Sequence, residues 1–412
     1  MVKLSALGLI AVVPLFVACG ESPTQPSPAA LHVASAMADH AWRTCASAAK
    51  YVVTDEAGLD AALQAAAPGD VIAIDGMIQI TQPVMLVTQG VTLTCGAPGA
   101  GLTGHGPSDW GTLLYLGAPD VVVRGLNINA AYEDAIQGYP NPPYGVSPAR
   151  AQVTDNQVAC GPSNVDCVFF MNTTGIQVAH NQIECGLVCV YTWTVTDAVI
   201  SDNYLAQPTP GYCGIWAQDT IDGTRIERNT LVSTSTLACN YPYGGAIRPN
   251  TGTGVVIADN VIRGTWLNGI ATAKLSDSRI ENNVVEDASW YGIFFSTFTR
   301  GVVLDPISRR VLVTGNKLTG RKAGIFAKWA CDNVFVANLF GGAAPWAAVF
   351  DTTTGQNLFV GRGDVLDNGH FDCDGHGYVD PNLIIGRRIV MGATPDPVLS
   401  EVLPDVHGGT LH

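Results

Sequence analysis

Side chains that can bind sugars recur beside a repeated glycine–isoleucine pair. The pair stands at 214–215, 269–270, 292–293 and 324–325, and alanine replaces its glycine at 246–247. Aromatic, amide and basic residues are frequent one and three positions after each isoleucine, and Trp193 adds a ring from a neighbouring loop. The candidate ligand-binding residues are Trp193, Trp216, Gln218, Arg248, Asn250, Phe294, Phe326 and Lys328.

Such a set is typical of a carbohydrate-binding surface. Aromatic rings stack on the C–H faces of sugars, and amides hydrogen-bond to their hydroxyls. If the strands alternate, all these side chains point away from the core on one exposed face. The alternative is that long loops cover the rings and bury them as a second core.

A complete catalytic set is not evident. A polysaccharide lyase needs a base near the carbon that bears the acidic proton and a cation at the uronate carboxylate. Arg248, Lys274 and Lys328 are the basic residues near the predicted surface. Adjacent carboxylates occur at 133–134 and 286–287, and neither pair matches a known catalytic motif. The three basic residues are therefore the catalytic candidates, and whether the chain is an enzyme stays open.

One loop near the C-terminus has the spacing of a calcium loop. Asp372, Asp374 and Asp380 stand at its first, third and ninth positions, with glycine at the sixth. Leu383 replaces the bidentate glutamate of an EF-hand loop at the twelfth position. The loop is thus a candidate Ca²⁺ site, and the alternative is a solvated acidic turn.

The elements that must carry these residues are set by an asparagine repeat. A valine or isoleucine precedes each anchor by three residues, and an aliphatic residue follows it by two. The spacing between anchors varies from 22 to 33 residues, which is typical of a solenoid with loops of variable length. The anchors are Asn156, Asn181, Asn203, Asn229, Asn260, Asn283 and Asn316.

The repeat predicts strands. Its apolar residues alternate with period two and are mostly β-branched. A turn of 22 residues has no room for crossover helices, so we expect a parallel β-helix whose coils pair at about 4.8 Å. The asparagines then stack at one corner as an architectural ladder. Residues 59–67 predict one short helix that covers the open first coil.

The segment from Asp55 through Gly69-Asp70-Val71-Ile72, followed by the repeat, resembles the right-handed parallel β-helix repeat proteins. That pectate-lyase-like superfamily includes polysaccharide lyases, polygalacturonases and repeat proteins without assigned chemistry. The resemblance implies an all-β, single-stranded right-handed parallel β-helix of roughly ten coils with a short N-terminal capping helix. We assign the β-helix to 50–390 and a loosely packed tail to 391–412. Because the shared residues are architectural, the resemblance implies no particular activity.

The N-terminus resembles a bacterial lipoprotein signal. Lys3 precedes a fifteen-residue apolar run that ends in Val17-Ala18-Cys19. The resemblance implies a signal peptide over 1–18, acylation of Cys19 and a disordered tether to residue 49, rich in proline and serine at its start. The alternative is an ordinary secretory peptide with an incidental Cys19. We therefore expect a lipid-anchored protein of the bacterial cell envelope, facing either the periplasm or the cell surface.

The remaining cysteines predict disulfides. With Cys19 acylated, ten of the eleven remain, an even number in an exported chain. They are Cys45, Cys95, Cys160, Cys167, Cys185, Cys189, Cys213, Cys239, Cys331 and Cys373. Cys45 with Cys95 and Cys331 with Cys373 would hold the first and last coils.

The middle pairs have two possible connectivities. Cys160 and Cys185 each follow a ladder asparagine by four residues, so they are expected on adjacent coils and could pair there. The rival scheme is sequential and joins Cys160 to Cys167 and Cys185 to Cys189.

Three functions fit the sequence. A net charge of −14 argues against nucleic acid as the main partner, and we expect a monomer that contacts the membrane through its lipid anchor alone. The first hypothesis is a module that binds a polysaccharide or other glycan. The second is a polysaccharide lyase or glycoside hydrolase, and the third is a structural or adhesive stalk.

Overall fold

A computed structural model describes the chain from residue 45 to 391. It leaves out residues 47, 105–110, 131–133, 141–145, 162–165, 208–212, 235–243, 297–306, 377 and 380 within that span. All described residues belong to the compact unit Trp42–His412. No helix in this part of the chain is long and apolar enough to cross a membrane.

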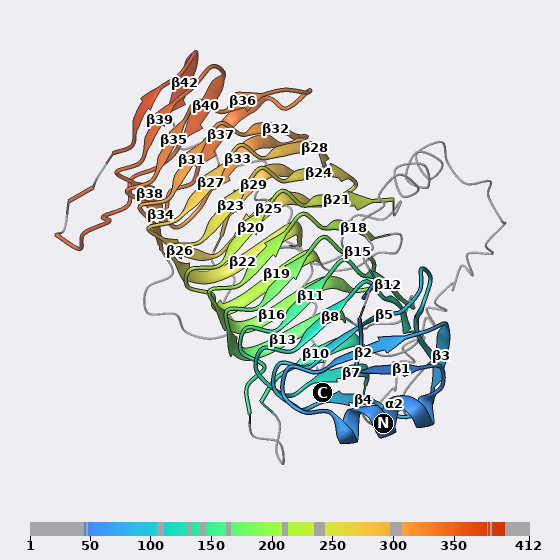
Figure 1. The fold of residues 1–412 in the computed structure, drawn as a ribbon. Helices are drawn as coiled ribbons and strands as arrows, with labels where there is room; N and C mark the ends of the chain where they lie inside the picture. The colour runs from blue at the N-terminus through green and yellow to red at the C-terminus, as the bar shows by residue number, and fades with distance from the viewer. Residues whose placement is uncertain are drawn as a thin grey trace, which may run out of the picture. The chain divides into compact units, whose positions relative to one another are not determined.

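The predicted parallel β-helix is confirmed: three parallel sheets run side by side along the chain (Figure 1). Sheet 1 has fourteen strands, one from each successive coil. They are β1 (Tyr51–Val53), β2 (Val71–Ile74), β5 (Thr92–Cys95), β8 (Val122–Arg124), β11 (Gln152–Thr154), β14 (Gln177–Ala179), β17 (Val199–Ser201), β20 (Arg225–Glu227), β23 (Val256–Ala258), β27 (Arg279–Glu281), β31 (Leu312–Thr314), β35 (Val334–Val336), β39 (Leu358–Val360) and β41 (Leu383–Ile385).

Sheet 2 follows sheet 1 within each coil and has eleven strands. They are β3 (Met77–Ile80), β6 (Gly101–Gly104), β9 (Asn127–Ala130), β12 (Gln157–Cys160), β15 (Gln182–Glu184), β18 (Tyr204–Gln207), β21 (Thr230–Ser233), β24 (Val261–Gly264), β28 (Val284–Ala288), β32 (Lys317–Gly320) and β36 (Leu339–Phe340).

Sheet 3 carries the glycine–isoleucine strands. Its first members are β4 (Val84–Leu86), β7 (Thr112–Leu116), β10 (Asp134–Gly138), β13 (Asp166–Thr174), β16 (Val188–Thr196), β19 (Cys213–Thr220) and β22 (Gly245–Thr253). Beyond β22 the next four coils each supply two shorter strands in place of one, and the last two described coils supply one each. One series is β25 (Asn268–Thr272), β29 (Tyr291–Phe295), β33 (Ala323–Ala327), β37 (Trp346–Phe350), β40 (Asp364–Asp367) and β42 (Arg388–Met391), and the other is β26 (Lys274–Ser276), β30 (Ser308–Arg309), β34 (Ala330–Cys331) and β38 (Thr354–Gly355).

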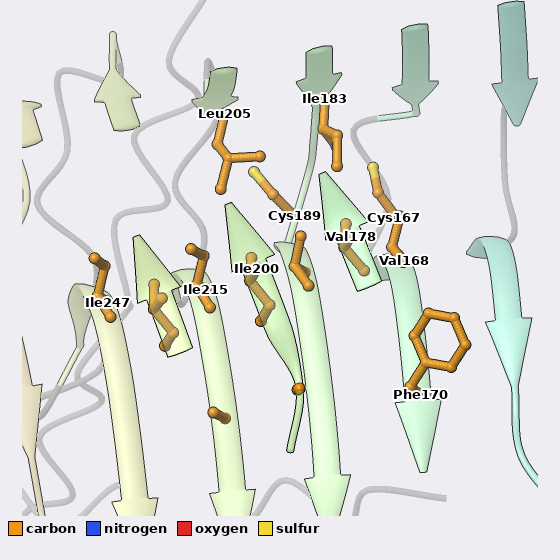
Figure 2. Packing of buried hydrophobic residues seen from close by; sticks show 14 of the residues in the cluster. Cys167, Val168, Phe170, Val178, Ile183, Cys189, Ile200, Leu205, Ile215 and Ile247 are labelled. Carbon is orange, nitrogen blue, oxygen red and sulfur yellow. The ribbon is translucent and has the colours of Figure 1, made fainter. Parts of the chain in front are cut away.

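The core is a stack of aliphatic side chains inside the three sheets. Val178 and Ile200 pair on adjacent strands of sheet 1 and point into the same interior as Ile215 and Ile247 of sheet 3 (Figure 2). All four side chains are fully buried. Burying one such side chain contributes about 1.5–3 kcal/mol, and each coil repeats the contribution.

The predicted N-terminal helix is α2 (Glu56–Ala65), which lies at the first coils (Figure 1). Asp55 caps it, since its side chain accepts a hydrogen bond from the Gly58 amide at 2.7 Å. Leu59 and Ala62 face the core and are buried. The helix therefore covers apolar surface that the first strands would otherwise expose.

The prediction of roughly ten coils was too low. Repeats at both ends of the stack lack the full asparagine signature. Leu126 occupies the anchor position on the coil before Asn156, because its amide donates to the Asn156 side chain. Asn338 continues the ladder beyond Asn316, but Phe335 and Phe340 replace the aliphatic residues that define the pattern.

Four disulfides join described cysteines. The predicted pairs Cys45–Cys95 and Cys331–Cys373 are present. The coil-to-coil pair Cys160–Cys185 was wrong, and the sequential pairs Cys160–Cys167 and Cys185–Cys189 form instead. In-register residues on stacked strands point the same way, whereas residues across a corner of one coil face each other. Cys213 is buried and free, and Cys239 lies outside the described residues.

Candidate functional site

Five aromatic side chains form a continuous row on the outer face of sheet 3, here called the aromatic row. Neighbouring ring centroids are 5.3, 6.4, 5.0 and 4.9 Å apart, within the range of favourable aromatic pairing. Parallel register aligns four of the residues in one column, in which Gln137 takes the position on β10, and the fifth residue follows β10. Most of these rings are half-buried and so still present surface to solvent. The row consists of Tyr115, Tyr139, Phe169, Tyr191 and Trp216.

Polar groups border the row on one side. The Tyr191 hydroxyl donates a hydrogen bond of 2.7 Å to the Gln218 side-chain oxygen, and Trp193 donates its indole N–H to Asp219. Burial raises the pKa of Tyr191 above its usual range, and the charges of Asp166 and Asp219 raise it further. The hydroxyl therefore stays neutral and acts as a hydrogen-bond donor.

A buried arginine closes one end of the row. The Arg248 guanidinium lies 4.7 Å from the centre of the Trp216 ring, a cation–π geometry, and the residue is only 2% exposed. The Cys213 thiol lies close by; burial raises its pKa, although contact with Arg248 partly opposes that shift. This end of the row thus has a fixed positive charge and a protonated thiol.

Two aspartates stand at the edge of the same face, where β10 and β13 begin. One oxygen of the Asp134 carboxylate accepts a hydrogen bond from the Asp166 amide at 2.8 Å, and the other accepts one from Gln137. Burial, followed by the charge of Asp134, raises the pKa of Asp166 well above its ordinary value. The two carboxyl groups therefore have different environments although they lie on adjacent strands.

Comparison with known families agrees with the three-sheet topology. Residues 166–340 match the family model described as right handed beta helix region. The chain is a right-handed parallel β-helix. No curated protein sequence matches it.

Among solved structures, the β-helix is similar to the Dettilon tailspike protein at 13% identity and a TM-score of 0.45, covering 80% of this chain and 64% of the tailspike. It is similar to a PL6-family polysaccharide lyase from Pseudopedobacter saltans at 12% identity and a TM-score of 0.43. That match covers 84% of this chain and 94% of the lyase. It is also similar to the A-module of a mannuronan C-5 epimerase from Azotobacter vinelandii, at 12% sequence identity and a TM-score of 0.46. That match covers 84% of this chain and 97% of the A-module.

Four of the predicted ligand-binding residues lie in one column on sheet 3. Register places Trp216 opposite Arg248, and Phe294 opposite Phe326. Trp193 lies on β16 rather than in a loop, paired with Gln218, and is 38% exposed. Gln218 is half-buried beside it.

The prediction that this whole face is exposed was wrong for its C-terminal half. Phe294 and Phe326 are 7% and 1% exposed and pack with Tyr291 in a second apolar cluster outside the main core. Arg248, Asn250 and Phe294 border a hollow of about 10 Å³, which has room for no more than one water molecule. This cluster is therefore closed to a sugar ring.

The three basic candidates lie on different strands. Lys274 starts β26 and pairs with Thr251, whereas Arg248 is three positions earlier on β22. Lys328 follows β33, three coils beyond Arg248, a rise of about 14 Å at the usual strand spacing. That separation is too large for Arg248 and Lys328 to neutralise one carboxylate. Their catalytic roles stay predictions.

The candidate calcium loop uses its carboxylates within the protein. One Asp372 oxygen accepts backbone hydrogen bonds from Asp374, Gly375 and His376 at 3.3, 2.8 and 3.1 Å. Asp374 accepts one from Gln356 at 3.0 Å and lies 3.9 Å from Arg309.

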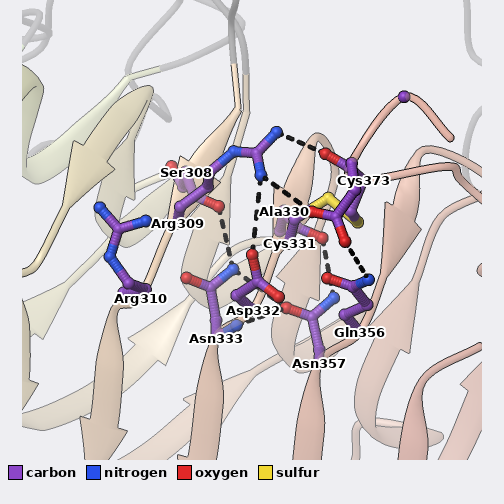
Figure 3. A network of polar contacts seen from close by, with 12 residues as sticks. Ser308, Arg309, Arg310, Ala330, Cys331, Asp332, Asn333, Gln356, Asn357 and Cys373 are labelled. Carbon is purple, nitrogen blue, oxygen red and sulfur yellow. Dashed lines mark hydrogen bonds and ion pairs between the residues drawn. A yellow bond between two sulfur atoms is a disulfide. The ribbon is translucent and has the colours of Figure 1, made fainter. Parts of the chain in front are cut away.

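Arg309 also donates to the Cys373 carbonyl at 2.6 Å, which ties this loop to β30 (Figure 3). Between residues 45 and 391, outside the gaps, no group of three metal-ligating side chains was found. Asp380 lies outside the described residues. The calcium site stays a prediction.

Sequence reasoning missed Phe169, Tyr191 and the aspartate pair. β13 and β16 lack the glycine–isoleucine pair, because Val168 and Val190 stand at the position that Ile215 occupies on β19. An aliphatic residue followed by an aromatic one was the signal that could have found them.

Proposed function

We propose that this β-helix binds a polysaccharide along the aromatic row. The observation that carries the proposal is a row of contacting rings, four of the five half-buried, with amide and carboxylate groups beside them. Rings spaced by one coil can contact successive residues of an extended glycan, and Gln218 and Asp219 can accept hydrogen bonds from hydroxyls. We also propose that the protein is held at the bacterial cell envelope through an acylated Cys19, which lies outside the described residues.

Affinity electrophoresis tests the binding function. The full chain, kept soluble in a polyoxyethylene detergent, would be run through gels containing alginate, polygalacturonate, xylan or dextran. We expect retardation in at least one gel. Trp216→Ala should weaken it about tenfold, equivalent to about 1.4 kcal/mol, because it removes the largest ring of the row.

Trp346→Ala is the matched control. Trp346 is a half-buried tryptophan on the same sheet at the start of β37, remote from the row, and its removal should leave retardation unchanged. If no gel retards the wild-type chain, the binding proposal fails and a structural stalk becomes the better explanation.

A further inference from the structure

The two aspartates at the edge of the row occupy equivalent positions on adjacent coils of the β-helix. Ile136 pairs with Val168, and the same register sets Asp134 opposite Asp166. In-register residues on adjacent parallel strands are about 4.8 Å apart. Their carboxyl groups therefore belong to one small region on the outer surface.

The pair is asymmetric. The Asp134 carboxylate accepts hydrogen bonds from the Asp166 amide and the Gln137 side chain, and both bonds favour its ionised form. One oxygen of Asp166 is shielded from solvent and, in the described part of the chain, has no hydrogen-bond donor. A carboxyl with a buried oxygen that no donor contacts favours its protonated form. Two carboxyls whose environments separate their proton affinities are the arrangement used for acid and base roles.

The pair is placed where a bound glycan would pass. Asp166 precedes Phe169 of the aromatic row by three residues on β13, and its charge is felt by Tyr191 one coil further. Gln137, which holds Asp134, stands in register with Phe169. A saccharide stacked on the row would bring its glycosidic linkages beside the two carboxyls.

We propose that Asp166 and Asp134 hydrolyse a glycosidic bond, with Asp166 as the general acid and Asp134 as the nucleophile. The proposal rests on glycan binding at the aromatic row. In the first step an Asp134 oxygen bonds to the anomeric carbon, the glycosidic C–O bond breaks, and the Asp166 proton goes to the departing oxygen. In the second step Asp166 removes a proton from water, and the water oxygen displaces Asp134 from the anomeric carbon.

The separation of the strands favours this two-step route. Carboxyls about 5–5.5 Å apart act by double displacement and retain the anomeric configuration, whereas inversion needs a wider gap that holds a water molecule. The backbones of adjacent strands are about 4.8 Å apart, which is close to the shorter of these two separations. The first product formed should therefore have the same anomeric configuration as the substrate.

Binding and cleavage would be measured together on the four polysaccharides, with the full chain and the variants D166N, D134N and D60N. Cleavage is followed as new reducing ends, and binding as gel retardation. We expect D166N and D134N each to lower cleavage at least about 100-fold while retardation changes less than threefold. Asp60 is exposed on α2, so D60N serves as the control that leaves both readouts unchanged. Retained retardation also shows that the variants fold.

The outcomes separate this proposal from the previous one. Retardation without new reducing ends in the wild type would overturn hydrolysis and leave glycan binding intact. Cleavage that persists in D166N or D134N would overturn the assignment of the pair. Neither retardation nor cleavage with any polysaccharide would overturn both proposals.

Discussion

At the scale of single residues, burial changes the chemistry of the outer face more than charge does. Asp166 and Tyr191 both have raised pKa values, and burial is the largest cause for each. Asp202, in contrast, makes a bidentate pair with Arg228 at 2.8 Å, and its pKa is lowered. A carboxyl on the aromatic face thus behaves unlike one at the corners of the coils.

The raised pKa of Asp166 predicts that stability falls as pH rises. In the unfolded chain its carboxyl loses its proton near pH 3.9, whereas the folded protein still holds that proton. The stabilising contribution is complete below the unfolded pKa and is lost as pH rises through the folded pKa. Relative to D166N, the wild type should lose about 1.4 kcal/mol for each unit by which the folded pKa exceeds 3.9.

Urea unfolding midpoints at pH 4, 5, 6 and 7 would measure this loss. Asp134, Tyr191 and Cys213 each interact electrostatically with Asp166, and Asp134 is the carboxyl among them. D134N should reduce the slope, because it removes a charge that raises the Asp166 pKa. A stability difference between wild type and D166N that is constant from pH 4 to 7 would contradict the prediction.

For single residues, the sequence correctly predicted the face of the sheet on which Trp216 and Arg248 lie, but it wrongly predicted that Phe294 is exposed. Strand parity was enough to place Trp216 and Arg248 on one face, since alternation is a local property. The exposure of Phe294 was not predictable in this way. It depends on rings from Tyr291 and Phe326, which only the stacking of coils brings together. Asp134 and Asp166 were missed because 31 residues lie between them and because the coil of Asp134 has Leu126 at the position of the ladder asparagine.

At the scale of the coil, a left-handed residue and an asparagine build each corner between sheets 1 and 2. The residue before each ladder asparagine has a positive φ, for example 54° at Arg228 and 56° at Asp259. The asparagine then donates its side-chain N–H to the next asparagine oxygen, as Asn229 does to Asn260 at 3.0 Å. This sharp turn explains why the sequence pattern predicted the corner and its ladder.

Removing one rung should weaken the whole stack. The Asn229 side-chain oxygen accepts hydrogen bonds from the backbone and side-chain N–H of Asn203, and its amide donates to the Ile200 carbonyl. Asn229→Ala leaves these buried groups without that partner, so we expect a loss of about 2–4 kcal/mol in the free energy of unfolding.

Urea denaturation of the Asn229 variant checks this value, with Asn129→Ala as the matched control. Asn129 is an exposed asparagine on β9, and its replacement should change stability by less than about 0.5 kcal/mol. Equal midpoints for the two variants would show that the ladder is not a source of stability.

At the scale of the whole molecule, the stack needs protection at its ends. α2 and the Cys45–Cys95 disulfide lie at the first coils. At the other end Cys331–Cys373 joins β34 to the segment beyond β40, and Leu383 of the last strand of sheet 1 is 63% exposed. The sequence predicted both end disulfides because each pair spans a terminal region. The middle pairs could not be chosen from sequence, since side-chain direction at a corner decides them.

The predicted lipid anchor also belongs to this scale, because it sets where the aromatic row can work. A flexible chain of about 30 residues between Cys19 and β1 would have an end-to-end distance of about 30 Å, so the β-helix would stay near the membrane surface.

Cys19→Ser removes the thiol that carries the lipid. In a bacterial host fed labelled palmitate, we expect the wild type to incorporate label and to sediment with membranes. The Cys19→Ser variant should neither incorporate label nor sediment with membranes, since an apolar signal peptide that is cleaved or released provides no stable anchor. Unlabelled wild-type protein in the soluble fraction would instead identify an ordinary secretory peptide, and the glycan would then be met in solution.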